Sequence, residues 1–455
     1  MLYSLSAKFF AAIMSLVIFF NGLSAFFPVF GDAKVDIAYT FSSAKAYSAA
    51  GTVTLSGDTD GEYELFWGTD GGKKLSVTRG EYEITYSEFA AVEVENGKGE
   101  AEIYSFTAIP AGAQSVLAYK GNAKAGEIDL PETKSGAGAA PVYSFGALSD
   151  LHFNRYNLSL CGDDAMLTFP NALNFLDLFD ISIVGMSGDI SNNGEENAFE
   201  KFNTVSSRYD FPVFTCTGNH DVSSLYTLEN WQKYVNTGVY SADKKDGVLN
   251  VSDNGMDFVY SGSETHGDVF IFLSQYKWDY NNETSRILTD EQLDWLALQL
   301  EAHKDKTVYL FFHTFLANAN GDKDTGEGNL KNSAGNTYDL VFTPGTPDEA
   351  RFTALMKQYK NVVFFNGHSH WAFDMQKFNP IMNITDYNGE YATLVHISSV
   401  SSPRRTTAVS PATTEWNMRS SEGYLAAVYD DYIVLTGCDF LAGEMLAYAA
   451  FVIER

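Results

Sequence analysis

The sequence predicts an α/β domain preceded by a small all-β sandwich. Beyond residue 142, five short apolar runs alternate with helix-like or loop segments, as the buried strands of an open α/β sheet do. Before residue 130, apolar residues alternate with polar ones, which is typical of half-buried antiparallel strands. With 455 residues the chain is longer than one hydrophobic core usually organises, so two domains are expected.

The amino terminus resembles an export signal. Lys8 precedes an apolar stretch at residues 9–20, and small residues follow at 21–25. This order predicts a signal peptide at residues 1–25 with cleavage after Ala25, and therefore a secreted, extracellular protein. Apolar residues resume through Phe30, so an uncleaved amino-terminal membrane anchor is the alternative.

Residues 34–130 are predicted to form the sandwich, a module of about a hundred residues. Alternation is clear at Val35, Ile37, Tyr39 and Phe41, and Gly- and Asn-rich turns separate the segments. The module has no cluster of catalytic residue types, so we interpret it as a spacer or packing module. Trp67 is expected in its core rather than on a carbohydrate-binding surface. Residues 131–141, rich in Gly, Ala and Ser, are the predicted linker.

Residues 142–455 are predicted to form the α/β domain. Apolar residues at 169–179 and 198–205 have helical spacing, and Thr289 to Gln292 form a capping box that opens another helix. Asp348 opens a further helix. Strand-like segments after residue 390 are expected to form or extend a second sheet: 393–397, 424–429 and 432–435.

Five apolar runs of this domain end in polar residues of a few types. Open α/β sheets build their sites at the carboxyl ends of such strands, so these side chains are expected to meet at one edge. The runs and the residues after them are 142–148 with Asp150 and His152, 181–186 with Asp189, 211–217 with Asn219, His220 and Asp221, 307–312 with His313, and 362–365 with His368 and His370.

These residue types indicate a metal centre. Carboxylate, imidazole and amide oxygen without thiolate suit Mn, Fe, Zn or a similar divalent ion. Seven candidate ligands are too many for one ion and suit two ions that share a carboxylate: Asp150, His152, Asp189, Asn219, His313, His368 and His370. A single histidine of this kind is more often a hydrogen-bonded, partly buried side chain, and His266, His303 and His396 are not expected to be ligands.

The composition excludes some classes of function. The formal charge of −28 repels nucleic acid, and the basic residues form no dense patch. An anionic substrate therefore needs local positive charge, which bound metal ions supply. Three cysteines, Cys161, Cys216 and Cys438, are too few for a disulfide framework, and Cys216 lies in an apolar run as a small buried hydrophobe.

The ordered motifs resemble those of the calcineurin-like metallophosphoesterases. The pattern Asp-x-His, Gly-Asp, Gly-Asn-His-Asp, a later His, and Gly-His-x-His stands at 150–152, 188–189, 218–221, 313 and 367–370. The resemblance covers about residues 142–400 and implies two packed mixed β-sheets flanked by helices. It implies one metal held by Asp150, His152, Asp189 and His370, and another held by Asp189, Asn219, His313 and His368. His220 would then assist the leaving group, with Asp221 as its partner.

The sandwich at residues 34–130 is also similar in pattern to the fibronectin-like amino-terminal domain of purple acid phosphatases. That subgroup has a tyrosine ligand three residues after the bridging Asp, where this chain has Asn192, so a purple iron-tyrosinate centre is not expected.

These features predict a secreted dinuclear-metal phosphoesterase. Two ions about 3.5 to 4 Å apart lower the pKa of a bridging water and bind phosphoryl oxygens for in-line attack. The substrate is expected to be a small-molecule phosphate ester, with monoester and diester both open. Arg404 and Arg405 are candidate phosphate-binding residues, although surface arginines are commoner. The alternative from another class is an exported surface-binding protein that keeps the fold as a non-catalytic scaffold, and its mark would be a broken ligand set.

Overall fold

The computed structural model describes residues 34–134, 136, 140–155, 164–223, 225–240, 245–275, 287–316, 346–377, 383–406, 414–416 and 419–455. The predicted signal at residues 1–25 and Cys161 lie outside these residues. The described residues form two compact units, one up to residue 140 together with 436–452, the other 141–435 together with 453–455. Within the described part of the chain, no helix combines the length and apolar composition that a membrane span needs.

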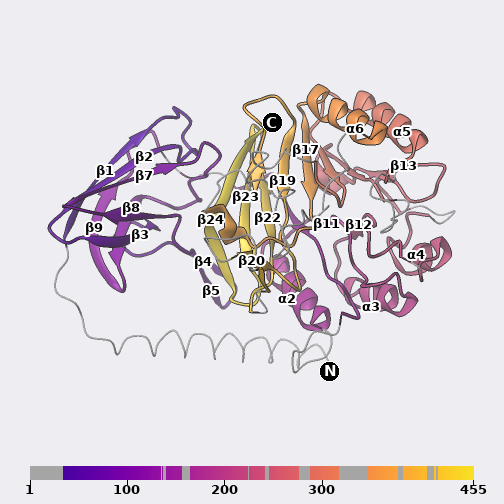
Figure 1. The fold of residues 1–455 in the computed structure, drawn as a ribbon, viewed down its shortest axis with the longest axis horizontal. Helices are drawn as coiled ribbons and strands as arrows, with labels where there is room; N and C mark the ends of the chain where they lie inside the picture. The colour runs from indigo at the N-terminus through magenta and orange to yellow at the C-terminus, as the bar shows by residue number, and fades with distance from the viewer. Residues whose placement is uncertain are drawn as a thin grey trace. The chain divides into compact units, whose positions relative to one another are not determined.

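The amino-terminal part of the first unit is all-β (Figure 1). It contains a three-stranded and a four-stranded antiparallel sheet and a separate hairpin. The three-stranded sheet has the order β1 (Val35–Phe41), β2 (Gly51–Gly57) and β7 (Lys98–Ile103). The four-stranded sheet has the order β6 (Ala90–Val94), β3 (Gly61–Gly68), β8 (Ser115–Lys120) and β9 (Ala123–Asp129), and β4 (Ser76–Arg79) pairs with β5 (Tyr82–Thr85).

Alternating burial produces one core between these two sheets. Val53 and Leu55 of β2 share a cluster of buried residues with Leu65 of β3. Trp67 is only 1% exposed and its ring stacks on Phe89 at 4.2 Å. The all-β prediction and the placement of Trp67 in the core are therefore confirmed.

The larger α/β region contains two mixed sheets. The six-stranded sheet has the order β12 (Val213–Thr215), β11 (Ile183–Met186), β10 (Tyr143–Leu148), β22 (Glu422–Val428), β23 (Tyr432–Asp439) and β24 (Glu444–Glu454). The seven-stranded sheet has the order β13 (Val248–Val251), β14 (Phe258–Tyr260), β15 (Val269–Phe272), β16 (Val308–Phe311), β17 (Val362–Asn366), β19 (Thr393–His396) and β18 (Ile384–Thr385). A further pair joins β20 (Arg404–Thr406) and β21 (Thr414–Trp416).

Parallel strands form the centre of the seven-stranded sheet and one side of the six-stranded sheet. β10, β11 and β12 are parallel, as are β15, β16, β17 and β19, and antiparallel strands extend both groups. The central strands are buried along their whole length, which explains why the sequence shows them as continuous apolar runs.

The two sheets pack face to face through aromatic rings. The Phe145 ring of β10 lies 5.3 Å from that of Phe270 and 4.7 Å from that of Tyr309, both in the seven-stranded sheet. At Gly185 of β11 a Cβ atom would lie 2.3 Å from Phe311, so the absence of a side chain allows this close approach.

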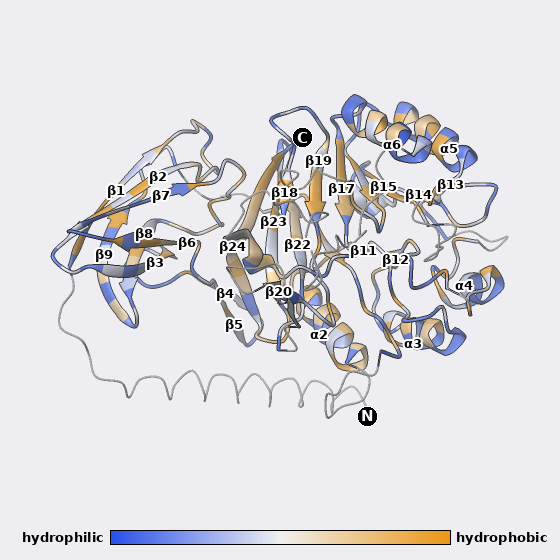
Figure 2. Cartoon of the chain, in the orientation of Figure 1, coloured by the Kyte–Doolittle hydropathy of each residue, from blue (hydrophilic) through white to orange (hydrophobic). Residues whose placement is uncertain are grey.

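Helices cover the outer faces of the sheets (Figure 1). Helices α5 (Asp290–Ala302) and α6 (Pro347–Gln358) cover the seven-stranded sheet, where Leu296 and Phe352 share a core with Leu310. Both helices carry hydrophobic and hydrophilic residues, as Figure 2 shows. Helix α2 (Ala165–Asp177) packs on β10, and α3 (Glu196–Ser206) and α4 (Leu228–Tyr234) follow β11 and β12. The predicted capping box at Thr289 and Gln292 is present, and the predicted fold class is confirmed.

Cys216 and Cys438 are buried. Burial raises the pKa of the Cys216 thiol, so this side chain is an unreactive apolar group.

Candidate metal centre

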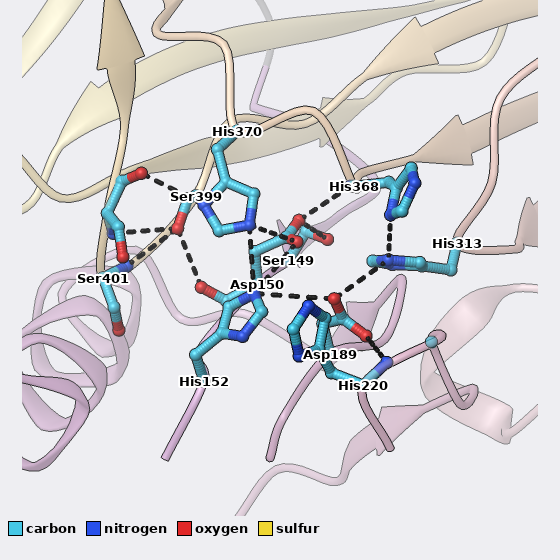
Figure 3. Close-up of polar contacts among 12 residues, drawn as sticks. Ser149, Asp150, His152, Asp189, His220, His313, His368, His370, Ser399 and Ser401 are labelled. Atoms are coloured by element: carbon cyan, nitrogen blue, oxygen red, sulfur yellow. Dashed lines mark hydrogen bonds and ion pairs between the residues drawn. The ribbon is translucent and has the colours of Figure 1, made fainter. Parts of the chain in front are cut away.

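Five parallel strands of the two sheets direct their carboxyl ends to one place. β10, β11 and β12 belong to one sheet, and β16 and β17 to the other. The polar residues that follow these strands converge there, and Figure 3 shows their side chains pointing toward one another. All seven predicted ligands are buried: Asp150, His152, Asp189, Asn219, His313, His368 and His370.

The first cluster contains Asp150, His152 and His370. Asp150 Oδ1 lies 3.0 Å from His370 Nε2 and 3.6 Å from His152 Nε2. The two histidine Nε2 atoms are 3.0 Å apart. Three ligand atoms therefore surround one point.

The second cluster is centred on His313 Nε2. This atom lies 3.2 Å from Asp189 Oδ2, 3.1 Å from Asn219 Oδ1 and 3.0 Å from His368 Nδ1. Asp189 Oδ2 is also 3.5 Å from His152 Nε2 of the first cluster. Asp189 therefore lies between the two clusters.

Backbone carbonyls fix which nitrogen of two histidines carries a proton. His313 Nδ1 donates to the Ser187 carbonyl at 2.7 Å, and His370 Nδ1 donates to the Ser402 carbonyl at 3.1 Å. In the neutral imidazoles the lone pairs are then on Nε2, which faces carboxylate or amide oxygens. Asp150 Oδ1 is likewise buried without a hydrogen-bond donor. Lone pairs that converge on lone pairs need a cation, so these residues fit divalent metal ions.

The electrostatics of the clusters agree with this fit. Burial lowers the pKa of His152 to about 3 and also lowers the pKa of His368 and His370, so these rings are neutral at pH 7, as metal binding requires. Burial raises the pKa of Asp189, but His313 and the neighbouring histidines outweigh it and hold that pKa below its usual range.

The electrostatics of His313 differ from those of the other candidate ligands. Burial lowers the pKa of its imidazole, but Asp189 more than offsets this effect and raises the pKa to about 9. Asp189 favours a proton on His313 Nε2, so a metal ion bound at this atom would displace that proton.

Five of the seven candidate ligands have a left-handed backbone conformation. Their φ angles lie between 49° and 78°, at Asp150, His152, Asp189, His368 and His370. Asp, Asn and His adopt this conformation more often than other residues with a side chain, but it still carries strain. Strain at the ends of several strands is typical of a functional site.

Glycines of two motifs allow close backbone approach to the carboxylates. A Cβ atom at Gly218 would lie 2.2 Å from Asp189 Oδ1, and one at Gly367 would lie 2.5 Å from Asp150 Oδ2. The ligand residues and the glycines beside them are therefore parts of one steric arrangement.

Comparison with known proteins identifies the family. The model of the calcineurin-like phosphoesterase family matches residues 143–372, which contain all five motifs. This chain is a calcineurin-like phosphoesterase. No curated protein matches the sequence.

Several solved structures are similar to the phosphoesterase. A dimetal phosphatase from Danio rerio has 15% identity and a TM-score of 0.44, covering 69% of this chain and 99% of its own. A purple acid phosphatase from yellow lupin (Lupinus luteus) seeds has 14% identity and a TM-score of 0.40, covering 92% of this chain and 74% of its own. The structure of PhoD has 13% identity and a TM-score of 0.38, covering 94% of this chain and 90% of its own.

His220 borders the metal-binding residues of the phosphoesterase. Its backbone N–H donates to Asp189 Oδ1 at 2.9 Å, and its ring centre lies 4.7 Å from that of His152. Together with His152 and Asp189 it forms a third group of potential metal ligands among the described residues. The side chain of His220 is only partly buried.

Asp221 is not the hydrogen-bond partner of His220, contrary to the sequence prediction. His220 Nδ1 donates to the Asn192 carbonyl at 2.8 Å. The Asp221 carboxylate instead accepts from the Ser191 N–H at 2.8 Å and the Gly218 N–H at 2.9 Å. Asp221 points back from the turn and joins the loops that carry Asp189 and Asn219.

A serine-rich segment after β19 supports the metal site and was missed by the sequence analysis. Ser399 Oγ donates to the Asp150 carbonyl at 2.8 Å and accepts from the Ser402 N–H at 2.9 Å (Figure 3). Ser149 Oγ donates to Asp150 Oδ2 at 2.6 Å. Only the position of this segment in the sequence could have identified it, because residues 398–402 also follow the carboxyl end of a parallel strand.

The remaining histidines are outside these clusters, as expected. His266 stacks on Tyr143, His303 ends α5, and His396 Nε2 contacts the Trp371 carbonyl at 3.1 Å. Of the predicted arginines, Arg404 donates its backbone N–H to the His370 carbonyl at 2.7 Å, whereas the side chain of Arg405 lies outside the described part of the structure.

Proposed function

We propose that this phosphoesterase is a secreted enzyme that binds two divalent transition-metal ions and hydrolyses small phosphate esters. The observation that carries the proposal is the pair of buried His and Asp clusters that share Asp189. One ion would be held by Asp150, His152, Asp189 and His370, the other by Asp189, Asn219, His313 and His368. When bound, the ions would lower the pKa of a water between them and neutralise phosphoryl charge.

Asp189 has the central role in this assignment. Its Oδ2 atom faces His152 on one side and His313 on the other, at 3.5 and 3.2 Å. Its Oδ1 atom is held by the His220 N–H, which fixes the orientation of the carboxylate. Replacing this side chain would affect both metal positions.

His220 is the proposed general acid. The Asn192 carbonyl holds the proton on Nδ1, so Nε2 is the atom that can exchange a proton with the substrate. As a protonated imidazole, His220 would donate from Nε2 to the departing ester oxygen. A neutral carbonyl orients the ring for this step.

Elemental analysis and kinetics of the exported, purified full-length chain test the proposal. We expect close to two transition-metal ions per chain and hydrolysis of a monoester, a diester or a nucleotide that chelators abolish. Asp189→Ala should lose most of both ions, whereas the exposed Asp305→Ala should keep them. A metal-replete stoichiometry near one would refute the two-metal assignment. Full metal loading without hydrolysis of any of these substrates would favour the non-catalytic scaffold.

A further inference from the structure

Asp257 is a buried carboxylate outside the two metal-binding clusters. It directly precedes β14 and is 0% exposed. Its Oδ1 atom accepts from the Ser274 N–H at 2.8 Å and from Gln292 Nε2 at 3.1 Å. Its Oδ2 atom accepts from Asn254 Nδ2 at 2.8 Å. Burial raises the pKa of Asp257 to about 6, so the group is an anion at pH 7.5, and an ionised acceptor holds its donors more firmly than a neutral one.

Ser274, which follows β15, joins Asp257 to the end of β12. The N–H of Ser274 donates to Asp257, and its carbonyl accepts from Gln292 Nε2 at 2.8 Å. Its Oγ atom accepts from the Thr217 N–H at 3.1 Å. The carbonyl of the next residue, Gln275, accepts from Thr217 Oγ1 at 2.7 Å. Asp257 therefore holds Ser274 in place, and Ser274 in turn holds Thr217.

Thr217 stands two residues before Asn219 and begins the turn that carries this candidate ligand. Asn219 Oδ1 lies 3.1 Å from His313 Nε2 in the second cluster. The strand before Ser274, β15, pairs with β16, the strand before His313. Ser274 therefore lies among the strand ends that carry two members of the second cluster. The residues of the first cluster follow β10 and β17, and neither of these strands pairs with β12 or β15.

Building on the proposed function, we propose that Asp257 is a positioning residue for the metal ion that Asn219, His313 and His368 would hold. Asp257 acts through Ser274 and Thr217, which fix the turn that presents the Asn219 amide oxygen. Hydrogen-bond partners that orient a metal ligand contribute to metal affinity although they do not touch the ion. Loss of Asp257 should therefore weaken the binding of this ion more than the binding of the other.

A purely structural role for Asp257 makes a different prediction. If Asp257 only stabilises the packing of β14 against α5, its loss lowers the free energy of unfolding and affects both ions alike, or neither. Its effect on metal affinity would then add to the effect of losing Asn219, as the effects of independent sites do.

The test is a titration of the metal-free full-length chain with Zn²⁺ at pH 7.5, in competition with a chromogenic chelator. Asn219→Ala identifies which of the two binding steps belongs to the second cluster. Asp257→Ala should weaken the same step by about 10- to 100-fold, as the loss of a supporting partner of a metal ligand does, and change the other step less than about threefold. The double variant should bind at that step no more than about threefold more weakly than Asn219→Ala alone, because Asp257 acts through Asn219.

Asp268 offers a matched control at the other end of β15. It is also a buried carboxylate, 3% exposed, and accepts from the Tyr143 hydroxyl at 2.6 Å. It directly precedes β15, whereas Ser274 follows this strand. Asp268→Ala should lower the free energy of unfolding in urea and leave both metal-binding steps unchanged.

A second variant tests the same chain of hydrogen bonds with a smaller change. Ser274→Ala removes the acceptor of the Thr217 N–H and keeps Asp257, so it should weaken the same binding step as Asn219→Ala does. If Asp257→Ala does not fold, the result for Ser274→Ala decides.

The outcomes separate this inference from the proposed function. Equal weakening of both steps, weakening of the other step alone, unchanged affinities, or a loss that adds to that of Asn219→Ala would overturn the inference, while a wild-type chain with two ions upholds the two-metal assignment. A wild-type chain that binds fewer than two ions would refute the proposed function, and the inference with it.

Discussion

The close approach at Gly367 predicts that Gly367→Ala damages the metal site without removing a ligand. A Cβ atom there would lie 1.9 Å from Ser149 Oγ and 2.5 Å from Asp150 Oδ2. Gly367 has an ordinary φ angle, so alanine adds a steric conflict and no backbone strain. Ser149 and the Asp150 carboxylate must both move.

The expected effect has a steric and a hydrogen-bonding part. Overpacking of a buried site costs about 1 to 3 kcal/mol of unfolding free energy. The displaced Ser149 hydroxyl also loses its 2.6 Å hydrogen bond to ionised Asp150, worth about 1.5 to 3 kcal/mol. We therefore expect Gly367→Ala to lower the free energy of unfolding by about 4 kcal/mol. Displacement of the Asp150 carboxylate should also weaken metal binding by about 10- to 100-fold, as the loss of a supporting hydrogen bond to a metal ligand does.

Urea unfolding in chelator measures the stability, and competition with a chromogenic chelator measures metal affinity. Gly267→Ala is the control, because Gly267 has a φ of 94° and open space around the added Cβ. It should cost only about 1 kcal/mol of backbone strain and leave metal affinity unchanged. The double variant Gly367→Ala with Ser149→Ala should recover part of the metal affinity, because it removes the nearest atom. Metal affinity within threefold of wild type in Gly367→Ala would refute this steric argument.

Four further predictions concern other parts of the chain. His220→Ala should keep both metal ions. Its rate of hydrolysis should fall about a hundredfold to ten-thousandfold on an alkyl phosphate and far less on a nitrophenyl ester. Loss of metal in this variant would show that His220 is a ligand. Asp221→Ala should slow the hydrolysis of both esters equally, because the Asp221 carboxylate contacts the backbone at Ser191 and Gly218. A loss of rate on the alkyl ester alone would instead support the prediction that Asp221 is the partner of His220. Burial raises the pKa of Asp257 to about 6, so the stability that this group contributes is complete below its unfolded pKa of about 3.8 and is lost as pH rises through 6. In urea unfolding, wild type relative to Asp257→Asn should therefore be more stable at pH 5 than at pH 7.5 by about 1 kcal/mol, and a pH-independent difference would contradict the shift. Finally, amino-terminal sequencing of exported protein should give a start near Phe26, and an intact Met1 in membrane fractions would favour the anchor.

The convergence of the candidate ligands could be predicted because it follows from strand geometry. A buried parallel strand is recognisable as a continuous apolar run, and the residues just beyond its carboxyl end must lie at one edge of the sheet. Asp189 after β11 and His313 after β16 are far apart in sequence, yet their ligand atoms lie 3.2 Å apart. The sequence did not reveal that the two strands belong to different sheets, because that depends on how aromatic faces such as those of Phe145 and Tyr309 pack.

The partner of His220 could not be predicted from residue types. A backbone carbonyl is present at every residue, so nothing in the sequence marks the Asn192 carbonyl as the acceptor. Asp221 was the predicted partner because it is next to His220 in the sequence, but neighbouring side chains of a tight turn point in different directions. Ser399 was missed for a related reason, since a hydroxyl that holds the Asp150 carbonyl has no distinctive spacing.

The backbone strain of the candidate ligands would link folding stability to metal binding. Asp150, His152, Asp189, His368 and His370 all have positive φ angles that glycine would adopt without strain. At about 1 kcal/mol each, the strain amounts to about 5 kcal/mol, comparable with the whole stability of a small domain. Glycine cannot bind a metal ion, so the chemistry of the ligands takes precedence over the preference of the backbone. Hydrogen bonds such as that from the Asp150 N–H to the Gly188 carbonyl offset part of the strain, and metal binding would offset the rest. Metal affinity and folding stability of this unit are therefore expected to be coupled, with the strained strand ends as the first part to open when the ions are removed.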